Sequence, residues 1–118
     1  MLLSSAMTTR EFPTLAERKA ARVAFLHEAV AALRNRLREY ARSHGGRFLL
    51  YGSAARGDLR FDSDIDMLID FPEDRLSDAW RFAEDRCREL DLKADLCPLA
   101  WCRDDFVEHI RKHAVALE

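Results

Sequence analysis

The chain has 118 residues, a length that suits one domain with its own hydrophobic core. Hydrophobic residues make up 48% of it and charged residues 34%, which is typical of a folded globular protein and excludes an intrinsically disordered chain. The formal net charge of −2 argues against a protein that holds nucleic acid by bulk charge, and no apolar run approaches the ~20 residues that a membrane-spanning helix needs.

The first part of the chain is predicted to be a flexible tail over residues 1–12, followed by a single domain over residues 13–118. Thr14 and Glu17 have the spacing of a capping box, which places the start of a long helix here. The apolar residues of this helix recur in steps of three and four, so they form one continuous stripe. We expect the helix to end at about Ser43, just before a pair of glycines.

The rest of the domain is predicted to alternate between strands and helices. Strands are expected over Arg47–Tyr51, Asp64–Asp70 and Ala94–Pro98. Helices are expected from Ser53 (a short one), over Asp78–Leu90 with Ser77 as its cap, and over Asp104–Ala116. This order predicts the α/β fold class, with a small mixed β-sheet packed by helices.

The main functional motif lies between the first two strands. Gly52 and Ser53 form a turn where backbone N–H groups can receive phosphate oxygens. After ten intervening residues, Asp64 and Asp66 open the second strand, and residues i and i+2 of a strand point to the same side. Two carboxylates at such a short distance repel each other unless a cation binds between them. Mg²⁺ is usually held by one or two carboxylates together with nucleotide phosphates. The motif therefore predicts a metal–nucleotide site.

A third carboxylate is expected from the next strand. Asp95 is the best candidate, because an acid flanked by apolar neighbours within a strand is costly to bury without a partner. Asp91 is the runner-up, although its place in a turn favours a structural role.

These residues resemble a known signature. Gly52-Ser53, ten residues and Asp64-Ile65-Asp66 resemble the motif of the DNA polymerase beta superfamily of nucleotidyltransferases. The longer string Tyr51-Gly52-Ser53-Ala54-Ala55-Arg56-Gly57 with Ser63-Asp64-Ile65-Asp66 is similar to its smallest members, the minimal nucleotidyltransferase (MNT) domains. The resemblance covers roughly Arg47 to Pro98, with a weaker similarity in the C-terminal helix.

The resemblance implies a polymerase-beta-like fold and an enzyme that moves AMP from ATP to a hydroxyl acceptor. It implies that Asp64, Asp66 and Asp95 bind two Mg²⁺ ions and that Asp95 helps to take the proton of the hydroxyl. Gly52 and Ser53 would hold the β- and γ-phosphates. Arg56 would either reach a phosphate or pair with one of the acids.

A stand-alone MNT domain resembles the antitoxin of a two-gene module whose usual companion is a HEPN-type toxin, a ribonuclease. The resemblance implies that the antitoxin adenylylates a tyrosine of this toxin. Two alternatives stay open. The chain could be a non-catalytic antitoxin that neutralises a partner by contact through its first helix. It could also be a free-standing antibiotic nucleotidyltransferase, which is less favoured because 118 residues leave no room for an acceptor domain.

The remaining polar residues have plainer interpretations. The three cysteines, Cys87, Cys97 and Cys102, form no Cys-x-x-Cys pair and are expected to be buried and inert in a reducing cytoplasm. His109 and His113 have a spacing that can grip a metal, but the sequence offers no further ligand beside them, which favours a structural role. The basic residues of the first helix are expected to form a solvated face, with a docking surface for an acidic partner or RNA as the alternative.

Overall fold

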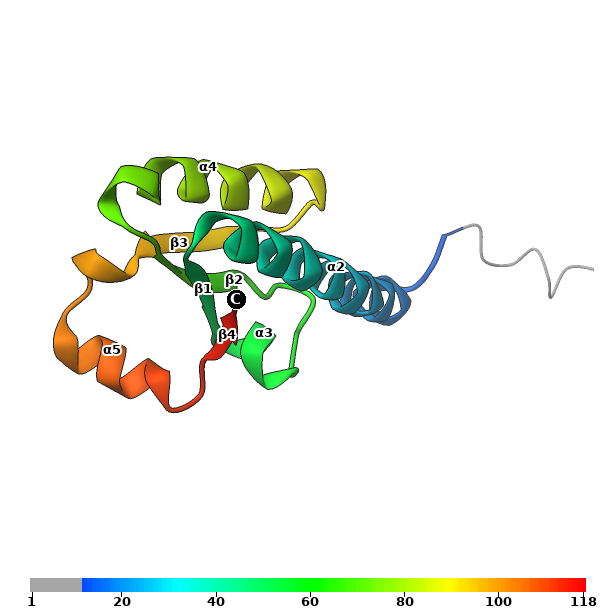
Figure 1. Cartoon of the computed structure of the whole chain (residues 1–118). Coiled ribbons are helices and arrows are strands. Elements are labelled where there is room, and N and C mark those ends of the chain that lie inside the picture. Colours follow the sequence, from blue (N-terminus) through cyan, green and yellow to red (C-terminus); the bar gives the residue numbers. More distant parts are fainter. Residues whose placement is uncertain (1–11) are drawn as a thin grey trace, which may run out of the picture.

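The computed structural model describes residues 12–118, so nearly all of the tail predicted over residues 1–12 lies outside the described part of the chain. The elements follow in the order α2 (Leu15–His44), β1 (Arg47–Tyr51), α3 (Ser53–Arg56), β2 (Ile65–Asp70), α4 (Glu73–Glu89), β3 (Ala94–Pro98), a 3₁₀ turn (Leu99–Trp101), α5 (Asp104–Arg111) and β4 (Val115–Leu117), as Figure 1 shows. The α/β fold class with a small mixed sheet is confirmed. In residues 12–118, none of the helices has the length and apolar character to cross a membrane.

Four strands form the sheet in the order β3-β2-β1-β4. β1 runs antiparallel to both β2 and β4, whereas β2 and β3 are parallel. The parallel pair needs a crossover connection, and α4 supplies it. Helices α2 and α4 cover one face of the sheet, and α5 lies on the other (Figure 1). The sheet therefore has two covered faces, and the functional motif lies on the connection from β1 to β2.

The long helix α2 begins as its sequence predicts. Thr14 Oγ1 accepts a hydrogen bond from the Glu17 N–H at 3.1 Å, and Glu17 Oε1 accepts one from the Thr14 N–H at 2.8 Å. Gly45 ends the helix in the left-handed conformation at φ 73°, which glycine adopts without a steric penalty. The predicted capping box and glycine stop are both confirmed.

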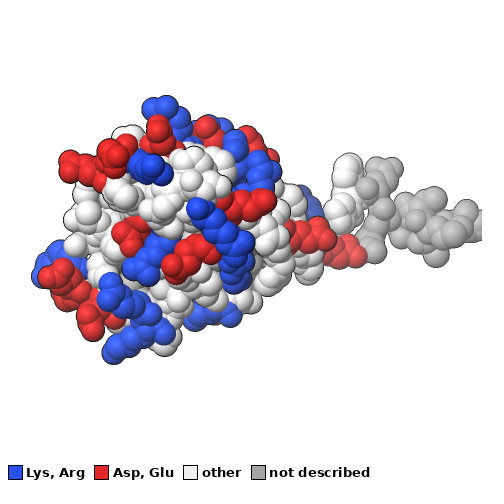
Figure 2. Space-filling model, in the orientation of Figure 1, with Lys and Arg blue, Asp and Glu red and all other residues white. Residues whose placement is uncertain are grey.

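The charged residues of the surface are mixed in sign. On the face shown in Figure 2, blue and red side chains alternate over the helices and form no single basic tract. This mixture of signs agrees with the small net charge of −2, and the solvated basic face of α2 stays a prediction.

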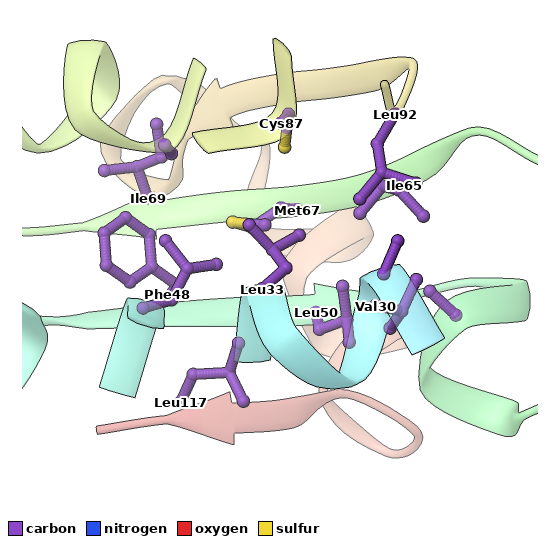
Figure 3. Packing of buried hydrophobic residues seen from close by; sticks show 14 of the residues in the cluster. Val30, Leu33, Phe48, Leu50, Ile65, Met67, Ile69, Cys87, Leu92 and Leu117 are labelled. Atoms are coloured by element: carbon purple, nitrogen blue, oxygen red, sulfur yellow. The ribbon is translucent and has the colours of Figure 1, made fainter. Parts of the chain in front are cut away.

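The core lies between the sheet and the helices α2 and α4 (Figure 3). One stripe of α2, which includes Leu33, packs on the inward-facing residues of the sheet, among them Phe48, Leu50, Met67 and Leu117. All five of these side chains have 0% exposure. A smaller cluster on the opposite face is formed by Leu49, Leu68 and Ile110, so that α5 is held against the sheet. This second face also carries the polar side chains of the site.

Two predicted elements are wrong in detail. Helix α4 begins at Glu73 rather than Asp78, and Ser77 lies inside it instead of capping it. Pro72 precedes the helix with φ −55°. The first turn contains two acidic residues, whose negative charges stabilise the helix by interacting with the positive end of its dipole. These start signals come earlier in the sequence than Ser77 and decide where the helix begins.

The end of the chain is the second correction. The predicted final helix over Asp104–Ala116 stops at Arg111, and Val115–Leu117 form strand β4. The edge of β1 has unpaired backbone groups that an added strand can satisfy, and burial of Leu117 in the main core adds to this gain. Tertiary pairing therefore overrides the local helical pattern of these last residues.

Candidate active site

The turn after β1 holds its glycine in a conformation that other residues avoid. Gly52 has φ 72° and ψ −153°, a region of backbone space that is essentially restricted to glycine. A Cβ atom on Gly52 would lie 2.6 Å from Oδ2 of Asp66, which is too close for any side chain. Strand β2 thus brings the carboxylate of Asp66 directly against the backbone of the Gly-Ser turn. Glycine is favoured at position 52 both by the backbone conformation and by the nearby carboxylate.

Two of the three predicted carboxylates lie on neighbouring strands, and the third lies just before one of these strands. Asp66 of β2 stands opposite Asp95 of β3 in the parallel register, and exposed Asp64 immediately precedes β2. The pKa of Asp66 is raised above its ordinary value, first by partial burial and then by the negative charges of Asp95 and Asp64. All three carboxylates therefore act on the same small region at one end of the sheet.

No described cation neutralises this cluster. Within residues 12–118, the ion pairs and side-chain hydrogen bonds join other acids and none of the three. Carboxylates that repel one another and lack a protein partner have the donor chemistry that Mg²⁺ prefers. In this same part of the chain no three His, Cys, Asp or Glu side chains close around one point as a complete metal site. The donor chemistry of the three carboxylates therefore fits a divalent metal whose other ligands come from outside the described residues.

Ser53 begins the short helix α3 and contacts the loop that leads to β2. Its hydroxyl donates to Oγ of Ser63 at 3.3 Å, and Oγ of Ser63 accepts the Arg60 N–H at 2.8 Å. Ser63 therefore braces the loop just ahead of Asp64. The N–H groups of the first helical positions find no acceptor within a helix, so those of Ser53 and Ala54 are available to a ligand.

Arg56 does not pair with any of the three site acids. Its Nε lies 3.3 Å from Oδ2 of Asp58, and both side chains are more than half exposed. An exposed pair of this kind contributes little to stability, so the guanidinium is free to exchange Asp58 for a phosphate. Its predicted role in nucleotide binding stays a prediction.

Tyr51 is a site residue that the sequence analysis did not single out. It stands opposite Asp66 in the antiparallel register of β1 and β2, and its ring packs edge-on against Phe106 with centroids 5.9 Å apart. Burial, followed by the charges of Asp66 and Asp95, raises the pKa of Tyr51 to about 12. Only the strand register reveals this neighbourhood, because nothing in the local sequence around Tyr51 indicates which residue faces it.

Other candidate residues lie elsewhere. Asp91 lies in a turn with φ 56° and pairs with Arg22 at 3.3 Å, which supports its structural interpretation. His109 and His113 are exposed and belong to no metal-binding group in the described residues.

The cysteines differ from one another. Cys87 is buried as expected. Cys97 and Cys102 are only half-buried, and their Sγ atoms lie 3.9 Å apart on the site face, so the expectation of burial is wrong for these two. The 3₁₀ turn after β3 brings them together, because it turns the chain within the four residues that separate them.

The fold and the site together define an α/β protein with a four-stranded mixed sheet, a glycine turn after β1 and acidic side chains from two neighbouring strands. The Nucleotidyltransferase domain family matches residues 30–117. A solved structure described as a candidate minimal nucleotidyltransferase has a TM-score of 0.63 and 25% sequence identity, and the match covers 75% of this chain and 93% of that chain. A search of curated proteins finds no significant match. The chain belongs to the nucleotidyltransferase domain family, whose members generally use a nucleoside triphosphate and a divalent metal.

Proposed function

We propose that this protein transfers AMP from ATP to a hydroxyl group and releases pyrophosphate. The observation that carries the proposal is the cluster of Asp64, Asp66 and Asp95. None of the three pairs with a cation of the described residues, and Asp66 lies against the Gly52 turn. Membership of the nucleotidyltransferase domain family supports it independently.

The three carboxylates are the residues that would hold the divalent metal, in our proposal two Mg²⁺ ions. When bound, the metal neutralises the triphosphate and stabilises charge on the entering and leaving oxygens. Gly52 leaves room for the carboxylate of Asp66, and the free N–H groups at the start of α3 orient the β- and γ-phosphates. The contribution of the chain is therefore mainly the positioning of the reactants and the matching of their charges.

The acceptor hydroxyl loses its proton in this reaction. Its oxygen forms a bond to the α-phosphorus, the bond from the α-phosphorus to the bridging oxygen breaks, and pyrophosphate leaves with that electron pair. Asp64 and Asp95 are both exposed, and we propose Asp95, on the outer strand β3, as the carboxylate that the acceptor reaches and that accepts the proton.

For the acceptor we propose a tyrosine of a HEPN-type toxin, so that the protein acts as the antitoxin of that ribonuclease. The support is the similarity to a structure described as a candidate minimal nucleotidyltransferase. Three apolar side chains of the α2 region, Phe12, Leu15 and Phe25, are 78%, 60% and 40% exposed, and we propose that the protein partner covers them. The same surface favours a second candidate function, a non-catalytic antitoxin that neutralises its partner by contact alone.

Intact-mass spectrometry of the partner toxin, after incubation with ATP and Mg²⁺, separates these functions. The wild type is compared with Asp64→Asn/Asp66→Asn and with Asp62→Asn, a matched control that removes an exposed acid from the loop just before the site. Catalysis predicts a gain of one or more AMP masses with the wild type and with Asp62→Asn, and no gain with the double variant. Neutralisation by the double variant with no change in mass would instead establish the contact-only function.

A further inference from the structure

The strand that carries Asp95 has an open edge. β3 is the outermost strand of the sheet, and in the described residues only β2 pairs with it. The carbonyl of Lys93 accepts a hydrogen bond from the Ile65 N–H at 2.8 Å, so alternate residues from Lys93 onward bond toward β2. The N–H and C=O groups of Ala94 and Leu96 therefore point away from the sheet.

A groove of about 520 Å³ runs along this open edge. Its apolar wall includes Trp80, Leu92 and Leu96, and the ring of Trp80 is braced edge-on by Trp101 with centroids 5.3 Å apart. Asp95 also lines the groove. The groove is thus continuous with the candidate active site, although most of its lining belongs to the other face of the sheet.

We propose that an extended peptide segment of the acceptor protein adds to β3 as a further strand and in this way presents its tyrosine to the site. This inference rests on the proposed AMP transfer. Strands pair about 4.8 Å apart, and side chains alternate between the two faces of a sheet. A tyrosine beside Asp95 then lies on the face that carries Asp66, and the residues before and after it face Trp80 and Leu96.

The lining favours a peptide over a nucleic acid. Arg22 and Arg88 are the arginines of the groove, and both are already paired with carboxylates, Arg22 with Asp91 and Arg88 with Asp85. Lys93 adds a third cation to the lining, but the acids Glu84, Asp91 and Asp95 line the groove as well, so the groove offers no uniform positive potential for phosphates. The groove instead has the two features that strand addition requires, outward-pointing backbone groups and an apolar wall. In strand addition, main-chain hydrogen bonds give affinity and side-chain pockets give specificity.

The test uses a library of nine-residue peptides, each with a central tyrosine, incubated with the full-length protein, ATP and Mg²⁺ and read by mass spectrometry. The best substrate is then resynthesised with single N-methyl groups at each position in turn. Strand addition predicts that methylation lowers the rate of AMP transfer by about tenfold at alternate positions and has little effect between them. This measurement needs no variant of the protein.

A variant pair tests the protein side of the contact. Ala94→Pro removes one outward N–H at the first residue of β3, where proline is tolerated because the bonds to β2 come from its neighbours. Ala94→Val keeps the N–H and is the matched control. We expect transfer to the peptide to fall about tenfold with Ala94→Pro only, while binding of ATP with Mg²⁺ stays unchanged in both variants.

The outcomes separate this inference from the proposed function. Equal sensitivity at successive peptide positions, or full transfer by Ala94→Pro, overturns strand addition. Transfer of AMP to RNA, free nucleotides or folded proteins but to no peptide also overturns it, while the AMP-transfer function stands. A wild-type protein that binds ATP with Mg²⁺ and modifies no acceptor of any class overturns the proposed function and the inference with it.

Discussion

The position of the Asp66 carboxylate depends on the absence of a side chain at Gly52, and Gly52→Ala tests this dependence. The substitution has two effects. It forces alanine into a backbone region that costs about 1–3 kcal/mol for residues other than glycine. It also places a Cβ atom 2.6 Å from Oδ2 of Asp66, so the carboxylate must retreat by about 0.8 Å to reach the 3.4 Å of an ordinary contact.

The two effects have different readouts. The backbone strain lowers the free energy of unfolding, and a loss of about 1–3 kcal/mol lowers the melting temperature by roughly 5–15 °C in a domain of this size. The displaced carboxylate affects the chemistry, where a misplacement of about 1 Å reduces the rate on the order of 100-fold. We therefore expect Gly52→Ala to melt earlier and to transfer AMP on the order of 100-fold more slowly.

Gly57→Ala is the matched control. Gly57 also has a positive φ, 81°, but a Cβ atom there has nothing within 4 Å. This variant carries backbone strain of about 1–2 kcal/mol without disturbing Asp66, so it should lose stability and keep its activity. Thermal melts and the rate of pyrophosphate release, both measured well below the melting temperature, compare the two variants. Equal rates for Gly52→Ala and Gly57→Ala would refute the argument that Gly52 sets the position of the carboxylate.

Three further predictions follow from charges and thiols at the site. Asp66→Asn removes a like charge opposite Asp95, worth roughly 0.2–1 kcal/mol, so without metal it should melt later than the wild type while losing AMP transfer; an earlier melt would contradict this. The pKa of Tyr51 rises from 10.0 to about 12 on folding. Between these two pH values the unfolded state binds fewer protons than the folded state, so the free energy of unfolding decreases as the pH rises. Urea titrations at increasing pH should therefore show a steeper decrease in the free energy of unfolding for the wild type than for Tyr51→Phe. Hydrogen peroxide should oxidise Cys97 and Cys102, whose Sγ atoms are 3.9 Å apart, to a disulfide with release of water, seen as the loss of two hydrogens by mass spectrometry and absent in Cys102→Ser.

Short-range signals in the sequence predicted the parts of the fold that depend on neighbouring residues. The Thr14–Glu17 capping box needs only one helical turn, and the structure contains both of its hydrogen bonds. The strands Arg47–Tyr51 and Ala94–Pro98 have their predicted bounds, because each apolar run is closed by residues that stop a strand. In contrast, β4 was predicted as helix, since its pairing with β1 depends on a partner more than sixty residues away in the chain.

The candidate site divides in the same way. The i, i+2 spacing predicts that Asp64 and Asp66 share a side, and the family resemblance points to Asp95. The neighbours of Asp66 could not be predicted locally, because the register of β2 with the strands on both sides of it determines them. That register places Tyr51 and Asp95 opposite Asp66, and no local pattern encodes it.

The charges of the three site carboxylates indicate that these residues are arranged to bind a ligand rather than to stabilise the fold. Asp66 and Asp95 stand opposite each other on paired strands. Partial burial of Asp66, followed by the negative charges of Asp95 and Asp64, raises the pKa of Asp66 instead of lowering it as an ion pair would. A carboxyl whose pKa is raised in the folded state costs stability once it ionises, so at neutral pH the cluster opposes folding. The large core between the sheet and α2 and α4 offsets this cost. The same repulsion favours binding of a cation, since a ligand that neutralises the folded state alone stabilises it by mass action.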